Sequence, residues 1–228
     1  MKVTLIDSMG SDLSVVNAAR VSFAKESYWD RGGREGEGIF KLKEGDARLI
    51  SYLARHNHWT PFGHTAVTLH VKAPIFVARQ LGKHQVGLVW NEVSRRYVTE
   101  KPEFYFPTEG WRRKPEGSVK QGSGDVIDDD DWVVECDKWY SEIALESLKL
   151  YDNMISRGVC AEQARMVLPQ SMYTEWYWTG NIAAFARVCN LRLDLHTQKE
   201  TRDIAKDISG LIEPIFPVSW KALMSNES

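Results

Sequence analysis

GHTAVTLHVKAP, residues 63–74, alternates apolar and polar side chains and runs directly into IFVARQLGKH, residues 75–84. Strict alternation is the pattern of a half-buried strand, so the odd-numbered side chains from Thr65 to Val71 should share one buried face. Pro74 ends the strand pattern, and the apolar spacing then changes to that of a helix. A strand followed at once by a helix therefore forms the centre of the predicted fold.

The flanking segments add a few strands and several helices. Further strands are expected at 2–7 and 172–179 and further helices at 12–20, 46–58, 131–157, 161–169, 182–194 and 199–211. Asp12, Asp46 and Asn181 stand where the helices at 12, 46 and 182 begin. Residues 30–38 read as a loop, and residues 100–131, rich in Pro, Gly and Asp, as a surface excursion. The mixture predicts an α+β fold with a small, mostly antiparallel sheet, in one domain over residues 1–228.

Composition excludes several classes of protein. The net charge is -2 and the pI is about 6.3, so no global basic field exists to hold a nucleic-acid duplex. There is no apolar run long enough to span a membrane and no signal-peptide pattern at the start. Cys136, Cys160 and Cys189 form no CxxC pair, which fits a reducing compartment. A cytoplasmic protein without membrane or nucleic-acid partners is expected.

The first candidate site is RQLGKHQVGLVWNEVSRRY, residues 79–97. Its cationic side chains, among them Arg79, Lys83 and Arg96, could hold a phosphate through charge-assisted hydrogen bonds. Gln80 and Asn91 offer the paired donor and acceptor that a pyrimidine edge requires. The alternative is an ordinary solvated basic helix and loop.

Four of the six histidines fall in HNHWTPFGHTAVTLH, residues 56–70. The spacing of His56, His58 and His64 suggests a metal site. Zinc sites usually add Cys, Asp or Glu ligands at a recognisable offset, and none is evident here. Polar packing or contact with a ligand is the better interpretation, and no metal is expected.

The third candidate site lies within residues 164–200. Asn181 stands where a helix N-terminus directs backbone N–H groups at an anion. Arg187 and Arg192 follow along the same helix, and an arginine close to an apolar stripe needs a partner. The competing interpretation is an internal salt bridge, for example to Asp194 or Glu200.

Together these segments resemble the flavin-dependent thymidylate synthase family. The matching stretches are HWTPFGHTAVTLHVKAPIFVARQ (58–80), NEVSRRY (91–97), ARMVLP (164–169) and NIAAFARVCNLRLDLHTQKE (181–200). The resemblance implies methylation of dUMP to dTMP with FAD, NADPH and methylenetetrahydrofolate, in a homotetramer whose sites are shared between subunits. It implies dUMP contacts from Gln80, Lys83, Glu92, Ser94, Arg95, Arg96, Arg165 and Arg192. It implies FAD contacts from His58, Thr60, Lys83, His84, Gln85, Asn181, Ala183, Arg187 and His196.

The chain departs from the family signature in two places. The family signature is usually Arg-His-Arg followed, after seven residues, by Ser. This chain has Lys83-His84-Gln85 followed, after eight residues, by Ser94. Lys83 keeps the charge but loses the bidentate fork of arginine, and Gln85 loses a charge. Arg187 stands where some relatives have Asn, and it could supply the phosphate charge that Gln85 withdraws.

The family resemblance gives Arg192 the activating role. A fixed cation beside uracil N3 favours loss of the N3 proton and stabilises charge on the ring, so C5 becomes nucleophilic without a covalent enzyme bond. Ser94 as a nucleophile would need an adjacent base, and its neighbours are cationic donors instead. The three cysteines are interpreted as structural.

Three alternatives remain open at this point. A related flavoenzyme could modify C5 of another pyrimidine nucleotide. The chain could be a catalytically silent nucleotide-binding or regulatory protein, although it retains Ser94, Arg96, Arg165 and Arg192 together. A zinc hydrolase is the third alternative.

Overall fold

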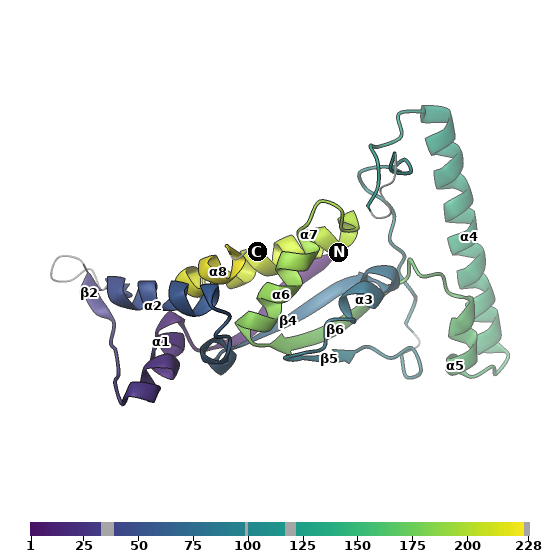
Figure 1. Ribbon diagram of the computed structural model, residues 1–228. Helices are drawn as coiled ribbons and strands as arrows, with labels where there is room; N and C mark the ends of the chain where they lie inside the picture. Colours follow the sequence, from purple (N-terminus) through teal and green to yellow (C-terminus); the bar gives the residue numbers. More distant parts are fainter. Residues whose placement is uncertain (33–38, 99, 117–121, 226–228) are drawn as a thin grey trace.

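The predicted α+β fold is confirmed, and an antiparallel sheet lies at its centre. The computed structural model describes residues 1–32, 39–98, 100–116 and 122–225 (Figure 1). The main sheet has four strands in the order β1-β4-β6-β5, all pairs antiparallel. Their bounds are β1 Lys2–Met9, β4 Ala66–Pro74, β6 Tyr173–Gly180 and β5 Leu88–Glu92. A separate two-stranded sheet pairs β2, Asp30–Gly32, with β3, Ile39–Lys41.

The central strand β4 buries one face, as its alternation predicts. Val67, Leu69 and Val71 are fully buried, and Leu69 lies opposite Trp178 of β6. The other face is polar and partly exposed, and Nε2 of His70 there lies 3.0 Å from the Glu175 carboxylate. One apolar and one solvated face is the usual arrangement of an antiparallel sheet.

The apolar face is covered by helices from both ends of the chain. Figure 1 shows α2, α6, α7 and α8 on one side of the sheet. The helices are α1 Asp12–Arg20, α2 Glu44–Arg55, α3 Ile75–Leu81, α4 Asp130–Ser156, α5 Ala161–Ala164, α6 Ile182–Arg192, α7 Lys199–Ile212 and α8 Pro217–Met224. Short 3-10 turns are η1 Val21–Phe23, η2 Thr60–His64 and η3 Arg165–Val167. Within this core, the rings of Trp178 and Phe185 meet edge to face at 5.4 Å.

Asp12 does not cap the helix that it was predicted to open. The N-cap of α1 is Ser11, and the buried Asp12 carboxylate instead accepts hydrogen bonds from the backbone N–H groups of Val218 and Ser219, at 3.0 and 2.8 Å. It therefore satisfies the first turn of α8. Helix α8 lies beyond the helix predicted over 199–211 and is not among the predicted elements.

Asp46 also has a role other than the predicted one. Helix α2 begins two residues earlier, at Glu44, with Lys43 as N-cap. Asp46 is buried and accepts hydrogen bonds from Arg20 and from the hydroxyl of Ser27. Pairing a buried carboxylate in this way ties α1 to α2.

Two further boundaries were misplaced. Residues 30–38 were read wholly as loop, but Asp30–Gly32 forms β2, and residues 33–38 lie outside the described residues. The sequence predicts no strand at residues 88–92, which belong to the basic segment 79–97. In the structure Leu88–Glu92 forms the outer strand β5. The predicted cap at Asn181 is confirmed, since its side chain accepts from the N–H of Ala184 at 2.8 Å.

Helix α4 stands apart from the sheet. Figure 1 shows it beyond the end of the sheet, joined to it through the irregular segment that precedes Asp130. The predicted helix is confirmed, but part of its apolar stripe is exposed: Trp132 is 43%, Trp139 46% and Ile143 64% exposed. Within the described part of the chain, no helix is long and apolar enough to cross a membrane.

Candidate functional site

A cleft lies where β4 passes into α3, and we call it the Lys83 cleft. Its volume is about 400 Å³, and it lies between α3, the segment after α3, and β5. The residues that line it are Ile75, Ala78, Arg79, Gly82, Lys83, His84, Gln85, Leu88, Trp90 and Glu92. Eight of these ten residues belong to the basic segment 79–97 singled out in the sequence, so the strand-to-helix junction places that segment around a cavity.

Gly180 allows this segment to approach the end of β6. A side chain at Gly180 would place its Cβ 2.7 Å from the carbonyl oxygen of Gly87 and against the side chain of Leu88. Gly87 has φ +77°, in the left-handed region that favours glycine. These two glycines bring the turn before β5 against the first turn of α6.

The same approach joins the first and third candidate segments. Arg192, at the end of α6, donates a hydrogen bond from Nε to Nε2 of His84 at 3.0 Å. Arg187 donates to the carbonyl oxygen of Val86 at 2.8 Å. Residues 83–86 are therefore held by two arginines from one helix.

The electrostatics of this contact favour a neutral histidine. Burial, then the charges of Arg192 and Arg187, lower the pKa of His84 below its ordinary value. Burial also lowers the pKa of Arg192. A neutral His84 that accepts at Nε2 carries its proton on Nδ1. The site thus contains an arginine cation beside an uncharged imidazole.

The internal salt bridges that were the competing interpretation for Arg187 and Arg192 are not formed among the described residues. Asp194 pairs with His196 at 2.9 Å, and Glu200 pairs with Arg112 at 2.6 Å. Across the described ranges, Arg187 and Arg192 meet no carboxylate within salt-bridge distance, and the same holds for Lys83. Arg192 is partly buried, and a partly buried cation without a carboxylate partner is costly, so its surroundings favour an anionic ligand.

Gln80 and Glu92 differ in whether their side-chain oxygens have hydrogen-bond partners. The Oε1 atom of Gln80 is buried and has no hydrogen-bond partner in the described residues. The Glu92 carboxylate accepts from the Thr174 hydroxyl at 2.7 Å and from the Trp90 indole at 3.2 Å. An orphaned buried amide oxygen is expected to receive a donor from a ligand.

A second group of predicted residues gathers elsewhere. Ser94 Oγ accepts from the backbone N–H and the Nε of Arg96, both at 3.3 Å. Arg96 lies 3.7 Å from the Glu162 carboxylate, and Arg165 donates to the Glu162 carbonyl oxygen at 3.3 Å. Ser94, Arg96 and Arg165 thus meet around Glu162. Arg95 turns away and donates to the carbonyl oxygen of Glu100.

The remaining predicted flavin residues surround η2 and α6. His58 is exposed, its ring 5.9 Å from that of Tyr52, and Thr60 is the first residue of η2. Ala183 is buried and lines, with Arg187, a second cavity of about 230 Å³. His196 is exposed beyond the end of α6, where Asp194 accepts from its backbone N–H.

The cysteines and histidines form no recognisable reactive centre among the residues described. Burial raises the pKa of the Cys189 thiol to about 12, so this thiol stays protonated and unreactive. Cys160 is exposed at the N-cap of α5, and Cys136 is half-buried on α4. The described residues include no group of three or more His, Cys, Asp or Glu side chains that could hold a metal.

Sequence reasoning missed several residues of the site. Leu88 and Trp90 line the Lys83 cleft because β5 is a strand that turns them towards α3. Asn57 and Trp59 line the second cavity with Arg187. The strand alternation within residues 88–92 was the available signal for the first pair. No local pattern marks the second pair, because η2 and α6 are distant in sequence.

Comparisons with known proteins cover almost the whole chain. Residues 4–218 match the family described as thymidylate synthase complementing protein. A flavin-dependent thymidylate synthase of Thermosipho africanus is 39% identical over 221 residues, 96% of this chain and 89% of the relative. One of Thermus thermophilus is 37% identical over 96% of this chain and 74% of the relative. A solved UMP/dUMP methylase of Streptomyces cacaoi, bound with 5-Br dUMP, gives a TM-score of 0.80 at 31% identity, covering 98% of this chain and 94% of that one.

Proposed function

The chain belongs to the flavin-dependent thymidylate synthase family, and we infer that it converts dUMP to dTMP by reductive methylation. The observation that carries this inference is the contact between Arg192 and His84. It places a partly buried cation, without a carboxylate partner among the described residues, beside the Lys83 cleft. A pyrimidine nucleotide monophosphate offers the negative charge that such a site requires.

Arg192 is proposed as the residue that activates the uracil ring. A guanidinium next to N3 lowers the pKa of that N–H and stabilises the negative charge that spreads over the ring once the proton leaves. C5 can then attack the methylene carbon of methylenetetrahydrofolate without help from an enzyme thiol. His84 holds Arg192 through its Nε2 and, being neutral, does not repel it.

The nucleotide is proposed to bind through two groups of residues. Gln80, Lys83 and Glu92 contact the base and sugar side, where Gln80 Oε1 is an unused buried acceptor within the described residues. Ser94, Arg95, Arg96 and Arg165 hold the phosphate, because charged donors and a hydroxyl suit phosphate oxygens. The gathering of three of these four residues around Glu162 supports this second role.

The residues present fit FAD as the resident cofactor. A dinucleotide carries a diphosphate. The N-terminus of α6 offers backbone N–H groups to such an anion, and Lys83 and Arg187 offer cations that have no carboxylate partner in the described ranges. His58, Thr60, His84, Gln85, Asn181, Ala183 and His196 complete the proposed contacts. When bound, FAD supplies the reducing equivalents, which NADPH renews.

The departures from the family signature have a structural counterpart. Arg187 donates a hydrogen bond to the carbonyl oxygen of Val86. A Cβ at the neighbouring Gly87 would lie 3.6 Å from the Arg187 guanidinium. The extra residue between Gln85 and Ser94 is thus accommodated in a turn that Arg187 holds. We expect Arg187→Ala to weaken FAD binding about ten- to a hundredfold, since one charge-assisted hydrogen bond contributes roughly 1.5–3 kcal/mol. Titration with FAD measures this, and Arg202→Ala, outside the site, is the control.

A second substrate is favoured by one specific comparison. The Streptomyces cacaoi methylase was solved with 5-Br dUMP and also with 5-Br UMP, the latter at a TM-score of 0.79. UMP differs from dUMP only in the ribose 2′-hydroxyl, so one site can take both. The alternative function is therefore C5 modification of UMP or another pyrimidine nucleotide.

We propose that the active form is a homotetramer with shared sites. The two proposed dUMP groups are held by different local partners, one by α6 and the other by Glu162. Helix α4 also presents Trp132, Trp139 and Ile143 largely exposed in the single chain, a face that a second copy would cover. A cytoplasmic location, as the sequence predicts, is part of the same proposal.

Turnover assays test the function. Purified protein with FAD, NADPH and methylenetetrahydrofolate should form dTMP from dUMP, and dCMP should not react. Product from UMP at a comparable rate would support the alternative. Arg192→Ala should reduce turnover at least a hundredfold while the far-ultraviolet circular dichroism stays normal. Binding of dUMP without any turnover of wild-type protein would instead indicate a silent nucleotide-binding protein.

Subunit mixing tests the shared site. An inactive Arg192→Ala chain is combined with an inactive Ser94→Ala, Arg96→Ala chain under conditions that allow exchange. If these groups come from different chains, some mixed sites are intact and activity returns. A protein that light scattering shows to be an active monomer would contradict the proposal.

A further inference from the structure

Two polar side chains lie on the apolar face of the sheet: Glu92, at the end of β5, and Thr174, near the start of β6. Glu92 pairs directly with Trp176, and Thr174 precedes Trp176 by two residues on the same strand. Residues that pair directly, and residues two apart along a strand, share one face of a sheet. Trp176 and Trp178 are buried on that face, so a hydroxyl and a carboxylate beside them need hydrogen-bond partners.

The Thr174 hydroxyl and the Glu92 carboxylate are partners of each other. Thr174 is 7% exposed, and its Oγ1 donates to Oε1 of Glu92 at 2.7 Å. Because the hydroxyl is shielded, water competes little for this hydrogen bond. A strand in the interior of the sheet therefore fixes one oxygen of a carboxylate on the outer strand.

Trp90 holds the other oxygen of the same carboxylate. Its Nε1 donates to Oε2 of Glu92 at 3.2 Å. The indole is itself fixed, since it stacks on Trp176 with ring centroids 4.2 Å apart and meets Trp178 edge to face at 5.4 Å. Both oxygens of Glu92 thus accept from donors that packed neighbours keep in place.

The carboxylate held in this way belongs to the Lys83 cleft. Glu92 and Trp90 both line the cleft, and Glu92 is exposed there. Across the described ranges, Glu92 forms no ion pair. An ionised carboxylate offers about four lone-pair sites, and Thr174 and Trp90 use two of them. The remaining sites can accept a hydroxyl or an N–H group from a ligand in the cleft.

We propose that Thr174 is a positioning residue for the nucleotide. Its hydroxyl fixes Glu92 so that the carboxylate is already oriented when it accepts from the base or sugar of dUMP. A glutamate fixed in advance does not have to be ordered when the ligand binds, and this favours affinity. The inference rests on the proposed function, in which Glu92 contacts dUMP, and it adds that Thr174 acts through Glu92.

Calorimetric titration of dUMP into the full-length, FAD-loaded protein tests this role. Thr174→Val keeps the shape of the side chain and removes the hydroxyl, so the dissociation constant for dUMP should rise about three- to tenfold. Thr174→Ser keeps the hydroxyl and should restore the wild-type affinity. Trp90→Phe keeps a stacking ring and removes the N–H group, so it should also weaken dUMP binding. The affinity for FAD should be the same in all these variants.

A double-mutant cycle separates positioning from a general structural effect. In a Glu92→Ala background, Thr174→Val should change dUMP affinity by less than about twofold, because the hydroxyl has no carboxylate left to orient. The two substitutions together should therefore cost no more affinity than Glu92→Ala alone. An equal loss from Thr174→Val in both backgrounds overturns the proposal.

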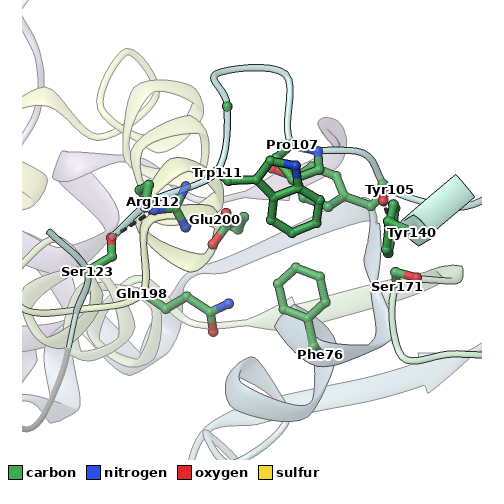
Figure 2. Close-up of a pocket in the computed structure, with 11 residues that line it drawn as sticks. Phe76, Tyr105, Pro107, Trp111, Arg112, Ser123, Tyr140, Ser171, Gln198 and Glu200 are labelled. Carbon is green, nitrogen blue, oxygen red and sulfur yellow. Dashed lines mark hydrogen bonds and ion pairs between the residues drawn. The ribbon is translucent and has the colours of Figure 1, made fainter. Parts of the chain in front are cut away.

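Tyr140→Phe is the matched control for the loss of one shielded hydroxyl. Figure 2 shows the Tyr140 hydroxyl bonded to the backbone of Tyr105, beside a separate cavity that Phe76 and Trp111 also line. That cavity shares no lining residue with the Lys83 cleft, so Tyr140→Phe should bind dUMP as wild type does.

The titrations also distinguish this role from the proposed function. A wild-type protein that does not bind dUMP contradicts the proposed function, and the role of Thr174 with it. Wild-type binding that Thr174→Val leaves unchanged overturns the role of Thr174 alone. Weaker binding by Thr174→Ser to the same extent as by Thr174→Val also overturns it, because the hydroxyl would then not be the group that matters.

Discussion

Arg192 Nε and His84 Nε2 are joined by a hydrogen bond of 3.0 Å across 108 residues of sequence. The bond brings the end of α6 against the segment that follows α3. Because His84 accepts this bond, it must be neutral at the accepting nitrogen. The hydrogen bond fixes the position of Arg192 beside the Lys83 cleft, which His84 lines.

The first prediction concerns the pKa of His84. Arg192→Gln removes the second largest cause of its lowering, so the pKa should rise towards the ordinary value. Arg187→Gln should raise it by less, because the Arg187 charge is the smaller of the two contributions. Titration of the His84 ring by NMR measures both. A pKa that does not change in Arg192→Gln would contradict the contact.

The same shift predicts a pH dependence of stability. The pKa of His84 is lower in the folded than in the unfolded chain, so the unfolded chain takes up the proton first as the pH falls. Its contribution to the free energy of unfolding is complete above about pH 6.5 and is lost as the pH falls below that value. Urea unfolding of wild type and His84→Gln at several pH values measures the difference. Parallel curves would show that His84 contributes nothing.

Gly180 should not tolerate a side chain. A Cβ at this position would lie 2.7 Å from the Gly87 carbonyl oxygen, and backbone cannot move as a flexible side chain can. We expect Gly180→Ala to lower the free energy of unfolding by about 1–3 kcal/mol. Gly210→Ala, in the interior of α7 with nothing within 4 Å, is the control and should stabilise by about 0.5–1 kcal/mol. Chemical denaturation compares the two.

Asp12 should be required for the last helix. Its buried carboxylate accepts from Val218 and Ser219, which are the first-turn donors of α8. Asp12→Ala leaves these N–H groups unsatisfied, so the free energy of unfolding should fall by about 1–3 kcal/mol. Asp152→Ala on the exposed side of α4 is the matched control. Faster hydrogen exchange within residues 217–224 of Asp12→Ala alone would locate the effect.

The three thiols should differ in reactivity. Cys160 is exposed and should react with a thiol reagent in the native protein, and half-buried Cys136 more slowly. Cys189 is fully buried, and its pKa is raised to about 12, so it should react only after denaturation. Counting modified thiols by mass spectrometry before and after adding urea checks this. Rapid native modification of Cys189 would show that α6 opens readily.

Several parts of the fold could be predicted because their signals are local. The alternation around Leu69 specified strand β4, and Asn181 followed by an apolar stripe specified α6, since each pattern is complete within a few residues. Helix α8 was missed because the donor groups of its first turn are satisfied by Asp12, 206 residues away for Val218. A cap supplied from such a distance leaves no local sign, and the remaining local sign is Pro217, a residue favoured at the first position of a helix.

The candidate site shows the same division. Its cationic residues could be named from the sequence, because charge and spacing are visible there. The sequence could not predict that these residues separate into one group at Arg192 and another at Glu162. That separation depends on which segments β5 and η3 bring together. The competing interpretation, an internal salt bridge of Arg187 or Arg192 to Asp194 or Glu200, is not formed in the described residues, because these carboxylates have other partners.

The sequence by itself determined most of the elements, the family and the chemical types in the site, because periodicity, caps and motifs are properties of short segments. Tertiary structure alone decided that Arg192 meets His84, that α4 leaves Trp139 exposed and that Trp111 faces Phe76 across a cavity. The physical reason is that contacts between distant segments depend on how closely backbones approach. At Gly180 that approach is possible only because no side chain is present.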